Sequence, residues 1–316
     1  MKKKNSPRKS DFRLPPFEQE LILAHILQKS REYVLTHLYP VTKITNKKTK
    51  KYVNGRKNIK KFFGDGAEIS LNKAQKAKFD SFISRRKSHE PLAYILGHKE
   101  FYGLDFKVDK NTLIPRPETE LLVEEIIKLN PKNINVIDIG TGSGNIIISL
   151  AANKKQRTKN DKINYYATDI SLDALVIARK NAKKYNLQNK IKFIKTDLIK
   201  YFIDHCSLIT GRCIIVANLP YLSKKIYNST LPDVKNFEPG AALLSGRDGL
   251  DHYERLFIQI ENIIRDTRYK IPYTILEISP EQKNKIEKMA KKYLPKCKIN
   301  FIKDLSGRWR VAKIEL

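Results

Sequence analysis

The chain has 316 residues, of which 41% are hydrophobic, and it carries a formal net charge of +29 at pH 7. This length and apolar content exclude a globally disordered chain and leave room for two domains. No apolar run is long enough to cross a bilayer, and no apolar signal core follows the basic N-terminus. The cysteines, Cys206, Cys213 and Cys297, show neither metal-ligand spacing nor a disulfide framework. We therefore expect a cytoplasmic protein with reduced thiols, no metal and no membrane partner.

The first 99 residues predict a small helical domain. Apolar residues recur at helical spacing over Phe17–Gln28, and Ser30 is expected to cap a short helix over Arg31–Leu38. Ser70 is expected to cap a longer helix that ends near Ser88. The residues that this helix is expected to turn toward a core are Leu71, Ala74, Phe79 and Phe82.

A basic insertion, about 41–68, interrupts this domain. Residues 1–63 carry 17 Lys and Arg against 4 Asp and Glu, and Lys43–Lys61 contains nine basic residues and no acid. Asn54-Gly55 suits the two-residue turn of a hairpin, so the stretch is either a basic hairpin or a loop. Such charge favours polyanionic partners, and two interpretations stay open: contact with RNA or a ribosome, or a solvated insertion.

The second predicted domain, 100–316, alternates strand-like and helix-like segments. The pattern over Phe101–Ile114 is extended around Gly103 and predicts a hairpin that joins the two domains. The predicted strands are Asn135–Ile139, Asn164–Thr168, Ile191–Lys195, Cys213–Ala217, Tyr273–Ile278, Lys298–Ile302 and Arg308–Ile314. The predicted helices fall near Glu118–Leu129, Asn145–Ala152, Leu172–Tyr185, Gly249–Ile264 and Pro280–Tyr293. This order predicts an α/β fold with a mainly parallel, Rossmann-like sheet of seven strands.

A glycine-rich turn follows the first of these strands. Glycines at 140, 142 and 144 permit positive φ angles and a close approach of the backbone to a ligand. This pattern alone also occurs in dinucleotide-binding folds. Asp138, just before the glycines, would repel a pyrophosphate but suits the cationic methionyl group of S-adenosylmethionine, directly or through water. Asp169, at the end of the next strand, can accept hydrogen bonds from both ribose hydroxyls.

A third acid completes this edge. Asp197-Leu198 ends the third strand, where the adenine amino group would lie in such a fold. Acids at the ends of three successive parallel strands form a coherent cofactor edge. The alternative for each acid is a helix cap or a surface carboxylate.

The fourth strand leads into Asn218-Leu219-Pro220-Tyr221. An amide or amino nitrogen is a poor nucleophile because its lone pair is delocalised. If Asn218 Oδ1 and the Leu219 carbonyl each accept one N–H, the lone pair is aimed at the methyl group and the growing positive charge is stabilised. Pro220 stiffens the loop and Tyr221 can pack on a planar substrate group. Together with the glycine turn, this segment indicates a methyltransferase that acts on nitrogen.

Several longer runs resemble the peptide chain release factor N5-glutamine methyltransferases. They are Glu90–Gly97 (EPLAYILG), Glu100–Gly103 (EFYG), Leu113–Glu120 (LIPRPETE), the glycine turn, Gly249–Asp251 (GLD) and Asp304–Val311 (DLSGRWRV). The resemblance covers nearly the whole chain from about Phe17. It implies transfer of a methyl group to the glutamine amide of the Gly-Gly-Gln motif of release factors, and a helical N-terminal domain that helps to dock them.

The resemblance also implies site residues. The catalytic segment would be Asn218, Leu219, Pro220 and Tyr221. The substrate would be bound by Arg116, Glu118, Asn218 and Tyr221, although an ion pair between Arg116 and Glu118 at a helix start is an equal alternative. The cofactor would be bound by Phe101, Asp138, Gly140, Thr141, Gly142, Gly144, Asp169, Ile170, Asp197, Leu198 and Asn218.

Leu219 departs from the family pattern, which usually reads Asn-Pro-Pro-Tyr. Leucine keeps the backbone carbonyl, so the amide clamp survives with less rigidity. Asn-Leu-Pro-Tyr also resembles the ribosomal RNA adenine-N6 dimethyltransferases, so an RNA adenine methyltransferase that flips its target base is the second hypothesis. A non-catalytic protein that binds RNA or ribosomes is the third. The sequence leaves the oligomeric state and the choice of release factors open.

Overall fold

The computed structural model describes residues 14–38, 71–153, 162–205, 211–265 and 269–316. The chain divides into two compact units, Met1–Leu96 and Gly97–Leu316, three residues before the boundary expected from the sequence. The basic insertion 41–68 lies outside the described residues. In the part of the chain that is described, no helix is long and apolar enough to cross a membrane.

The N-terminal unit is helical. Its helices are α1 (Pro16–Leu27), α2 (Arg31–Leu38), α4 (Lys73–Lys87) and α5 (Leu92–Leu96). They enclose a small core that includes Ile22, Val34, Phe79 and Phe82. Ser30 begins α2 as expected, since its Oγ accepts from the backbone N–H of Tyr33 at 3.2 Å.

The start of α4 differs from the prediction. Its cap is Asn72 and not Ser70: Asn72 Oδ1 accepts from Gln75 N at 2.9 Å, and Gln75 Oε1 accepts from Asn72 N at 3.0 Å. This reciprocal capping box satisfies two backbone N–H groups, whereas a lone serine cap would satisfy one of them. Because the helix begins there, Ala74 lies in its first turn on the solvent side, and its predicted place in the core was wrong.

The C-terminal unit opens with a hairpin of β1 (His98–Phe101) and β2 (Leu104–Lys107). Tyr102 and Gly103 both have positive φ, 50° and 70°, as in the turn type that matches strand twist. The predicted hairpin is therefore present, but it begins three residues before Phe101 and ends at Lys107, well before Ile114.

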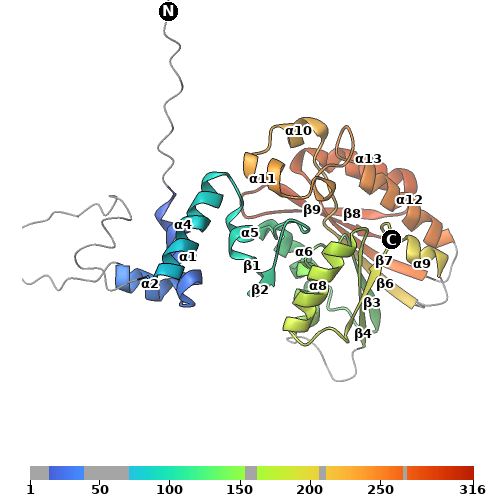
Figure 1. The fold of residues 1–316 in the computed structure, drawn as a ribbon. Helices are drawn as coiled ribbons and strands as arrows, with labels where there is room; N and C mark the ends of the chain where they lie inside the picture. The colour runs from blue at the N-terminus through green and yellow to red at the C-terminus, as the bar shows by residue number, and fades with distance from the viewer. Residues whose placement is uncertain (1–13, 39–70, 154–161, 206–210, 266–268) are drawn as a thin grey trace, which may run out of the picture. The chain divides into compact units, whose positions relative to one another are not determined.

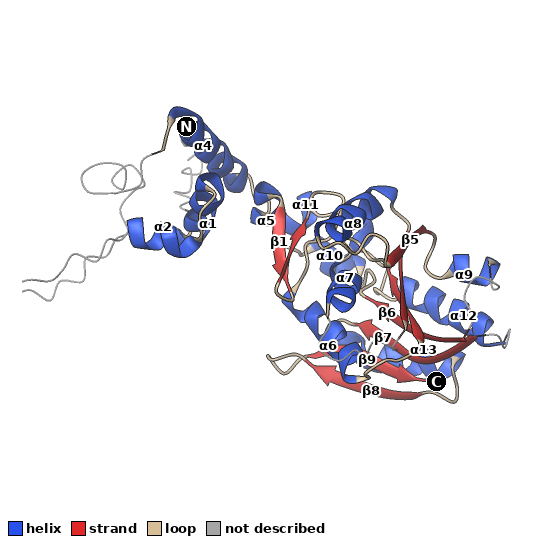
Figure 2. Cartoon of the chain, turned by 90° about the horizontal axis from the view of Figure 1, so that it is seen from below, coloured by secondary structure: helices blue, strands red, loops and turns tan. Residues whose placement is uncertain are grey.

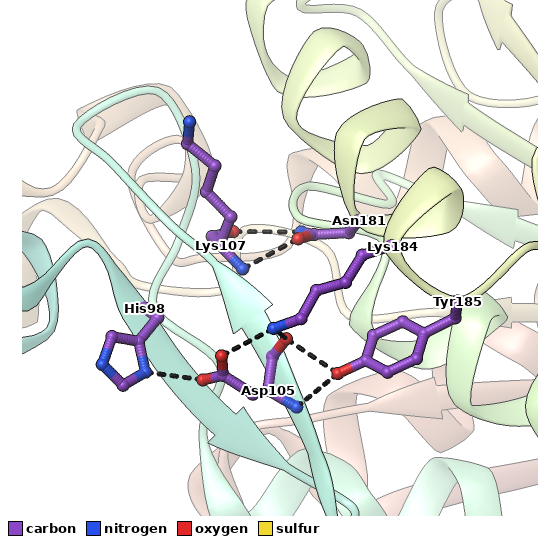
Figure 3. A network of polar contacts seen from close by, with 6 residues as sticks. All are labelled: His98, Asp105, Lys107, Asn181, Lys184 and Tyr185. Atoms are coloured by element: carbon purple, nitrogen blue, oxygen red, sulfur yellow. Dashed lines mark hydrogen bonds and ion pairs between the residues drawn. The ribbon is translucent and has the colours of Figure 1, made fainter. Parts of the chain in front are cut away.

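The hairpin is fastened to one helix, α8 (Leu172–Lys184), and to Tyr185 after it (Figure 3). Asn181 accepts from Lys107 N at 2.8 Å and donates to the Lys107 carbonyl at 3.0 Å. Tyr185 Oη accepts from Asp105 N at 2.7 Å, and Lys184 Nζ lies 2.6 Å from Asp105 Oδ2. These bonds fix where the chain leaves β2 and so place the segment that follows it.

The predicted seven-stranded sheet is present, in the order β5-β4-β3-β6-β7-β9-β8 (Figure 1). All neighbours are parallel except β9, which is antiparallel to both β7 and β8. The strands are β3 (Ile134–Ile139), β4 (Ile163–Asp169), β5 (Ile191–Lys195), β6 (Gly211–Ala217), β7 (Tyr269–Glu277), β8 (Lys298–Lys303) and β9 (Trp309–Glu315). The chain order reverses between β3 and β6, which is where ligands bind in open parallel sheets.

Helices cover both faces of this sheet (Figure 2). One face packs against α6 (Glu120–Lys128), α7 (Asn145–Ala152) and α8, and the other against α9 (Lys200–Asp204), α12 (Asp251–Arg265) and α13 (Lys283–Tyr293). Alternate strand residues serve the two layers: Val136 faces the first, and Ile137 and Ile139 face the second. The predicted Rossmann-like α/β core is confirmed.

Short elements account for most of the differences in detail. The predicted helices Glu118–Leu129 and Pro280–Tyr293 each begin as a 3₁₀ turn, at Pro117–Thr119 and Pro280–Gln282. The sequence did not predict α5, α9, α10 (Lys224–Asn228), α11 (Pro232–Phe237) or the turn Gly240–Ala242. Helices of five or six residues carry too little periodicity to be recognised.

Candidate active site

A cavity of about 290 Å³ opens at the carboxyl ends of β3, β4, β5 and β6. Residues 110–113, 115, 116 and 119 of the segment that follows the hairpin, and residues 239, 241 and 242, also line it. Of the predicted site residues, it is lined by Arg116, Gly140, Thr141, Gly142, Asp169, Ile170, Asp197, Leu198, Asn218, Leu219 and Pro220. The carboxyl edge of the sheet thus brings together most of the residues chosen from the sequence.

The glycine turn packs tightly between β3 and α7. Gly144 has φ 82° and begins α7, and a Cβ there would lie 2.7 Å from Ile148 Cδ1 and 3.3 Å from Ala178 Cβ. Gly144 is therefore required by packing between α7 and α8 and does not itself line the cavity. The buried amide of Asn181 donates to the Ser143 carbonyl at 2.8 Å, which joins the turn to the hairpin anchor described above.

Asp138 lies directly beneath this turn and is fully buried. Its Oδ2 accepts from Thr141 Oγ1 at 2.6 Å, whereas its Oδ1 has no hydrogen-bond partner among the described residues. Burial raises the pKa of Asp138 to about 7, and the nearby Asp169 adds to the rise. Asp138 does not itself line the cavity, although Gly140 and Thr141 beside it do, so its predicted contact with a cationic ligand group stays a prediction.

Asp169 lines the cavity at the end of β4. Its Oδ2 accepts from Gly142 N and its Oδ1 from Ser171 N, both at 2.9 Å. Each carboxylate oxygen has two lone pairs, so one acceptor position on each stays available for a ligand hydroxyl. Burial raises the pKa of Asp169 although these backbone donors oppose the rise.

Asp197 lines the cavity at the end of β5, but it does not act alone. Arg255 from α12 pairs with Asp197 Oδ2, and Arg255 and the neighbouring His252 both line the same wall. Leu198 has φ 53°, an uncommon angle for leucine, and turns the chain back toward α9 at this point. His252 and Arg255 could not be predicted as site residues, because no local sequence pattern in α12 distinguishes them.

The Asn218 side chain reaches across to a buried group of polar residues. Its Nδ2 donates to Thr119 Oγ1 at 3.1 Å, and Thr119 Oγ1 donates to Glu277 Oε2 at 2.7 Å. Tyr221 Oη donates to Glu277 Oε1 at 3.2 Å. Tyr221 is therefore turned toward Glu277 and does not line the cavity, so a place beside the substrate stays a prediction.

Leu219 has a packing role that a proline would not reproduce. Its side chain is 3% exposed within the core cluster of α12 and α13, and its Cδ2 would lie 3.4 Å from a Cβ at Gly140. The leucine thus joins the segment after β6 to the glycine turn after β3.

Arg116 is held by Glu238, not by Glu118. Glu238 is 5% exposed, pairs with Arg116 Nη2 through Oε1 and accepts from Ile114 N through Oε2 at 3.1 Å. The expected alternative of an Arg116–Glu118 ion pair is wrong, because a buried carboxylate from the end of α11 supplies the partner. Glu118 is half-buried and does not line the cavity.

Phe101 also lies away from the cavity. It is 1% exposed and packs against Phe106 across the hairpin, with the ring centroids 6.1 Å apart. A large ring at the end of a short strand lowers its free energy more by filling this apolar layer than by facing solvent. Its predicted contact with a cofactor stays a prediction.

In the described part of the chain, no three His, Cys, Asp or Glu side chains are arranged to hold a metal ion. The residues that the sequence reasoning missed are Thr119, Glu238, His252, Arg255 and Glu277. Glu277 carried one usable signal: it is an acid at the end of an apolar parallel strand, as Asp138 and Asp169 are.

Comparison with known proteins agrees with this geometry. Residues 130–236 match the methyltransferase domain family, and residues 66–97 match the PrmC N-terminal domain. A solved structure of the hMettl16 catalytic domain in complex with MAT2A 3'UTR hairpin 1 is similar in fold, with a TM-score of 0.52 and 18% identity over 80% of this chain and 84% of that one.

Closer relatives are found by sequence. The release factor glutamine methyltransferase of Staphylococcus aureus is 33% identical over 245 residues, which cover 78% of this chain and 83% of that protein. The one of Buchnera aphidicola subsp. Schizaphis graminum is 33% identical over 299 residues, covering 94% and 91%. By these similarities the chain belongs to the release factor glutamine methyltransferase family.

Proposed function

We propose that this protein transfers a methyl group from S-adenosylmethionine to the side-chain amide nitrogen of the glutamine in the Gly-Gly-Gln motif of peptide chain release factors. The observation that carries the proposal is the position of Asn218. Its side chain lines the same cavity as the glycine turn and Asp169, so an amide acceptor and a nucleoside-binding edge share one space.

The residues present fit the proposed cofactor. The glycine turn and Asp138 Oδ1, which has no hydrogen-bond partner in the described chain, suit the charged methionyl end, and Asp169 suits the ribose hydroxyls. The adenine would be enclosed by Asp197, Leu198 and Ile170. When bound, S-adenosylmethionine supplies an electrophilic methyl group on a sulfonium.

Asn218 and Leu219 would bind the substrate amide. Asn218 Oδ1 and the Leu219 carbonyl would each accept one N–H of the glutamine side chain. These acceptors hold the nitrogen with its lone pair toward the methyl donor and stabilise the positive charge that grows on it. A dedicated base is not needed, because the methylated nitrogen is acidic enough to lose its proton to water or to an acceptor of the clamp.

Arg116 and the segment around it would form the wall of the cavity on the substrate side. Glu238 holds Arg116 in place through a buried ion pair, and the hairpin anchor on α8 fixes the start of the segment. The N-terminal unit would help to dock the release factor. Glu118, Tyr221 and Phe101 would enter contact only with substrate or cofactor bound.

The test is a transfer assay with labelled S-adenosylmethionine and two acceptors. The protein is incubated with a release factor or with ribosomal RNA, and label is expected on the release factor alone. A release factor whose Gly-Gly-Gln glutamine is replaced by glutamate should take up no label. Label on RNA alone would overturn the proposal.

We further propose that the basic insertion contacts RNA or a ribosome, on the strength of the nine basic residues without an acid in Lys43–Lys61. Deletion of Lys43–Lys61 should weaken ribosome association more at low salt than at high salt while leaving methylation of the free release factor unchanged. Equal association of the two proteins at all salt concentrations would show that the insertion is a passive loop.

A further inference from the structure

Three side chains form a relay that runs from the cavity wall, at Asn218 and Thr119, to Glu277, which does not line the cavity. Asn218 Nδ2, Thr119 Oγ1 and Glu277 Oε2 are joined by hydrogen bonds of 3.1 Å and 2.7 Å. Thr119 and Glu277 are each 1% exposed. The relay connects the segment after β6, the turn before α6 and the end of β7, so it exists only in the folded sheet.

Counting protons along the relay fixes the direction of each bond. A threonine hydroxyl has one proton, and an ionised carboxylate can only accept. The other carboxylate oxygen of Glu277 accepts from Tyr221 Oη, so the proton of Thr119 is committed to Glu277. Thr119 Oγ1 can then only accept from Asn218, and the amide must turn its NH2 group toward Thr119.

This direction matters for the cavity. An asparagine amide can be rotated by 180° with little change in shape, so shape alone does not decide whether oxygen or nitrogen faces a ligand. If the NH2 group faces Thr119, Oδ1 faces the other way. A rotated amide would present its own N–H groups to the substrate NH2 group, which offers no hydrogen-bond acceptor.

We propose that Glu277, acting through Thr119, is a positioning residue that sets the orientation of the Asn218 amide and so presents Oδ1 as an acceptor to the substrate. The proposal deepens the proposed function and rests on it. Glu277 does not touch the substrate, and its effect passes through one hydroxyl proton.

The surroundings of Glu277 bear on its charge. Burial disfavours the ionised form most strongly and Glu118 adds to this, whereas the hydrogen bond from Thr119, the charge of Arg310 on β9 and the hydrogen bond from Tyr221 favour it. Tyr253 of α12 donates to the Glu277 backbone carbonyl. The net result is a pKa of about 7. Once protonated, Glu277 can donate to Thr119, which frees the hydroxyl to donate to Asn218 and allows the rotated amide.

The variants that test the relay are Thr119→Val and Thr119→Ser. Valine keeps the shape and removes the hydroxyl, so Asn218 Nδ2 loses its acceptor and kcat should fall about tenfold with KM within about threefold of wild type. Serine keeps the hydroxyl and should recover most of the lost kcat. In the wild type, kcat should fall as pH drops below about 7, and this limb should be absent in Thr119→Val and in Glu277→Gln.

Thr274→Val provides the matched control. Thr274 lies on β7, is fully buried, and its hydroxyl has no hydrogen-bond partner in the described chain. The same chemical change there should leave kcat and its pH profile as in wild type. Thermal unfolding and cofactor binding, measured for every variant, separate loss of fold from loss of orientation.

Three results would overturn the relay. They are a kcat for Thr119→Val within twofold of wild type, a pH limb that survives in that variant, or a serine variant as impaired as the valine one. If the wild type labels no release factor, the proposed function fails, but the relay is still decided by NMR. The Asn218 side-chain NH2 signals, assigned by their loss in Asn218→Ala, should shift with pH near 7 in the wild type and not in Thr119→Val.

Discussion

Two buried carboxyl groups at the same edge of the sheet, Asp138 on β3 and Glu277 on β7, differ in how their oxygens are satisfied. Both are almost completely buried, and burial raises the pKa of each to about 7. Asp138 Oδ2 accepts from Thr141, three residues away, and its Oδ1 has no hydrogen-bond partner among the described residues. Glu277 uses both oxygens, for Thr119 and Tyr221, which are distant in sequence.

The contrast separates a group that is prepared for a ligand from a group that serves other protein residues. An unpartnered buried oxygen costs free energy until a donor arrives, so Asp138 favours a bound cation. Each oxygen of Glu277 already accepts from a protein side chain, and Glu277 does not line the cavity, so it acts on the positions of its neighbours. Similar burial and a similar pKa thus give two different roles.

The largest effect is expected from Asn218→Ala, which removes the residue that Glu277 serves. We expect kcat to fall about a thousandfold, because one preorganised polar partner of the transition state is lost. The affinity for S-adenosylmethionine, measured by calorimetry, should stay within about threefold, because Asp138 and Asp169 are unchanged. Full methylation activity in this variant would refute the amide clamp.

The next effect is expected from Asp138→Asn, which removes the carboxylate charge that is proposed to attract the ligand. Affinity for S-adenosylmethionine should fall roughly 10- to 100-fold, as for loss of a hydrogen bond to a charged group. Calorimetry measures it, with Asp173→Asn on the exposed first turn of α8 as control. Unchanged affinity would show that Asp138 has no contact with the ligand and only supports Thr141.

The pH dependence of stability should reveal both groups together. Each carboxyl has a folded pKa near 7, above its usual value of 3.8 or 4.5, so the folded protein holds these protons more tightly than the unfolded chain. As far as these groups are concerned, the free energy of unfolding without ligand should therefore be highest below about pH 4, and it should fall by on the order of 3 kcal/mol per group as pH rises to about 7.

Denaturant titrations between pH 5 and pH 8 measure this slope. Asp138→Asn should flatten it and leave the remaining contribution to Glu277. A slope that is as steep in Asp138→Asn as in the wild type would mean that Asp138 is already ionised in the folded protein at pH 5.

The smallest effect is expected from Leu219→Pro, which introduces the residue that the family usually has after the asparagine. Because the Leu219 side chain is buried against the glycine turn, we expect a loss of about 1–2 kcal/mol in the free energy of unfolding. The backbone carbonyl is kept, so kcat should change by less than about threefold. A larger loss of kcat would show that the leucine, not the carbonyl alone, holds the acceptor in place.

The sequence by itself determined most of the elements and the polar edge of the sheet. Hydrophobic periodicity places the strands of the sheet, and Asp138, the glycines, Asp169 and Asp197 are close to one another because parallel strands end at one edge. These features depend on local pattern and on a general rule of α/β folds. The motif runs between Glu90 and Val311 also predicted the family, which the relatives confirm.

Only the tertiary structure decided which side chains from distant parts of the chain line the cavity or hold the residues that line it. Thr119, Glu238, Arg255 and Glu277 meet their partners across 58 to 158 residues of chain. It also placed Tyr221 and Phe101 in buried layers and gave Arg116 its partner. The physical reason is that a buried polar group must find a hydrogen-bond partner, and which partner lies within 3 Å depends on packing between elements that no local pattern encodes.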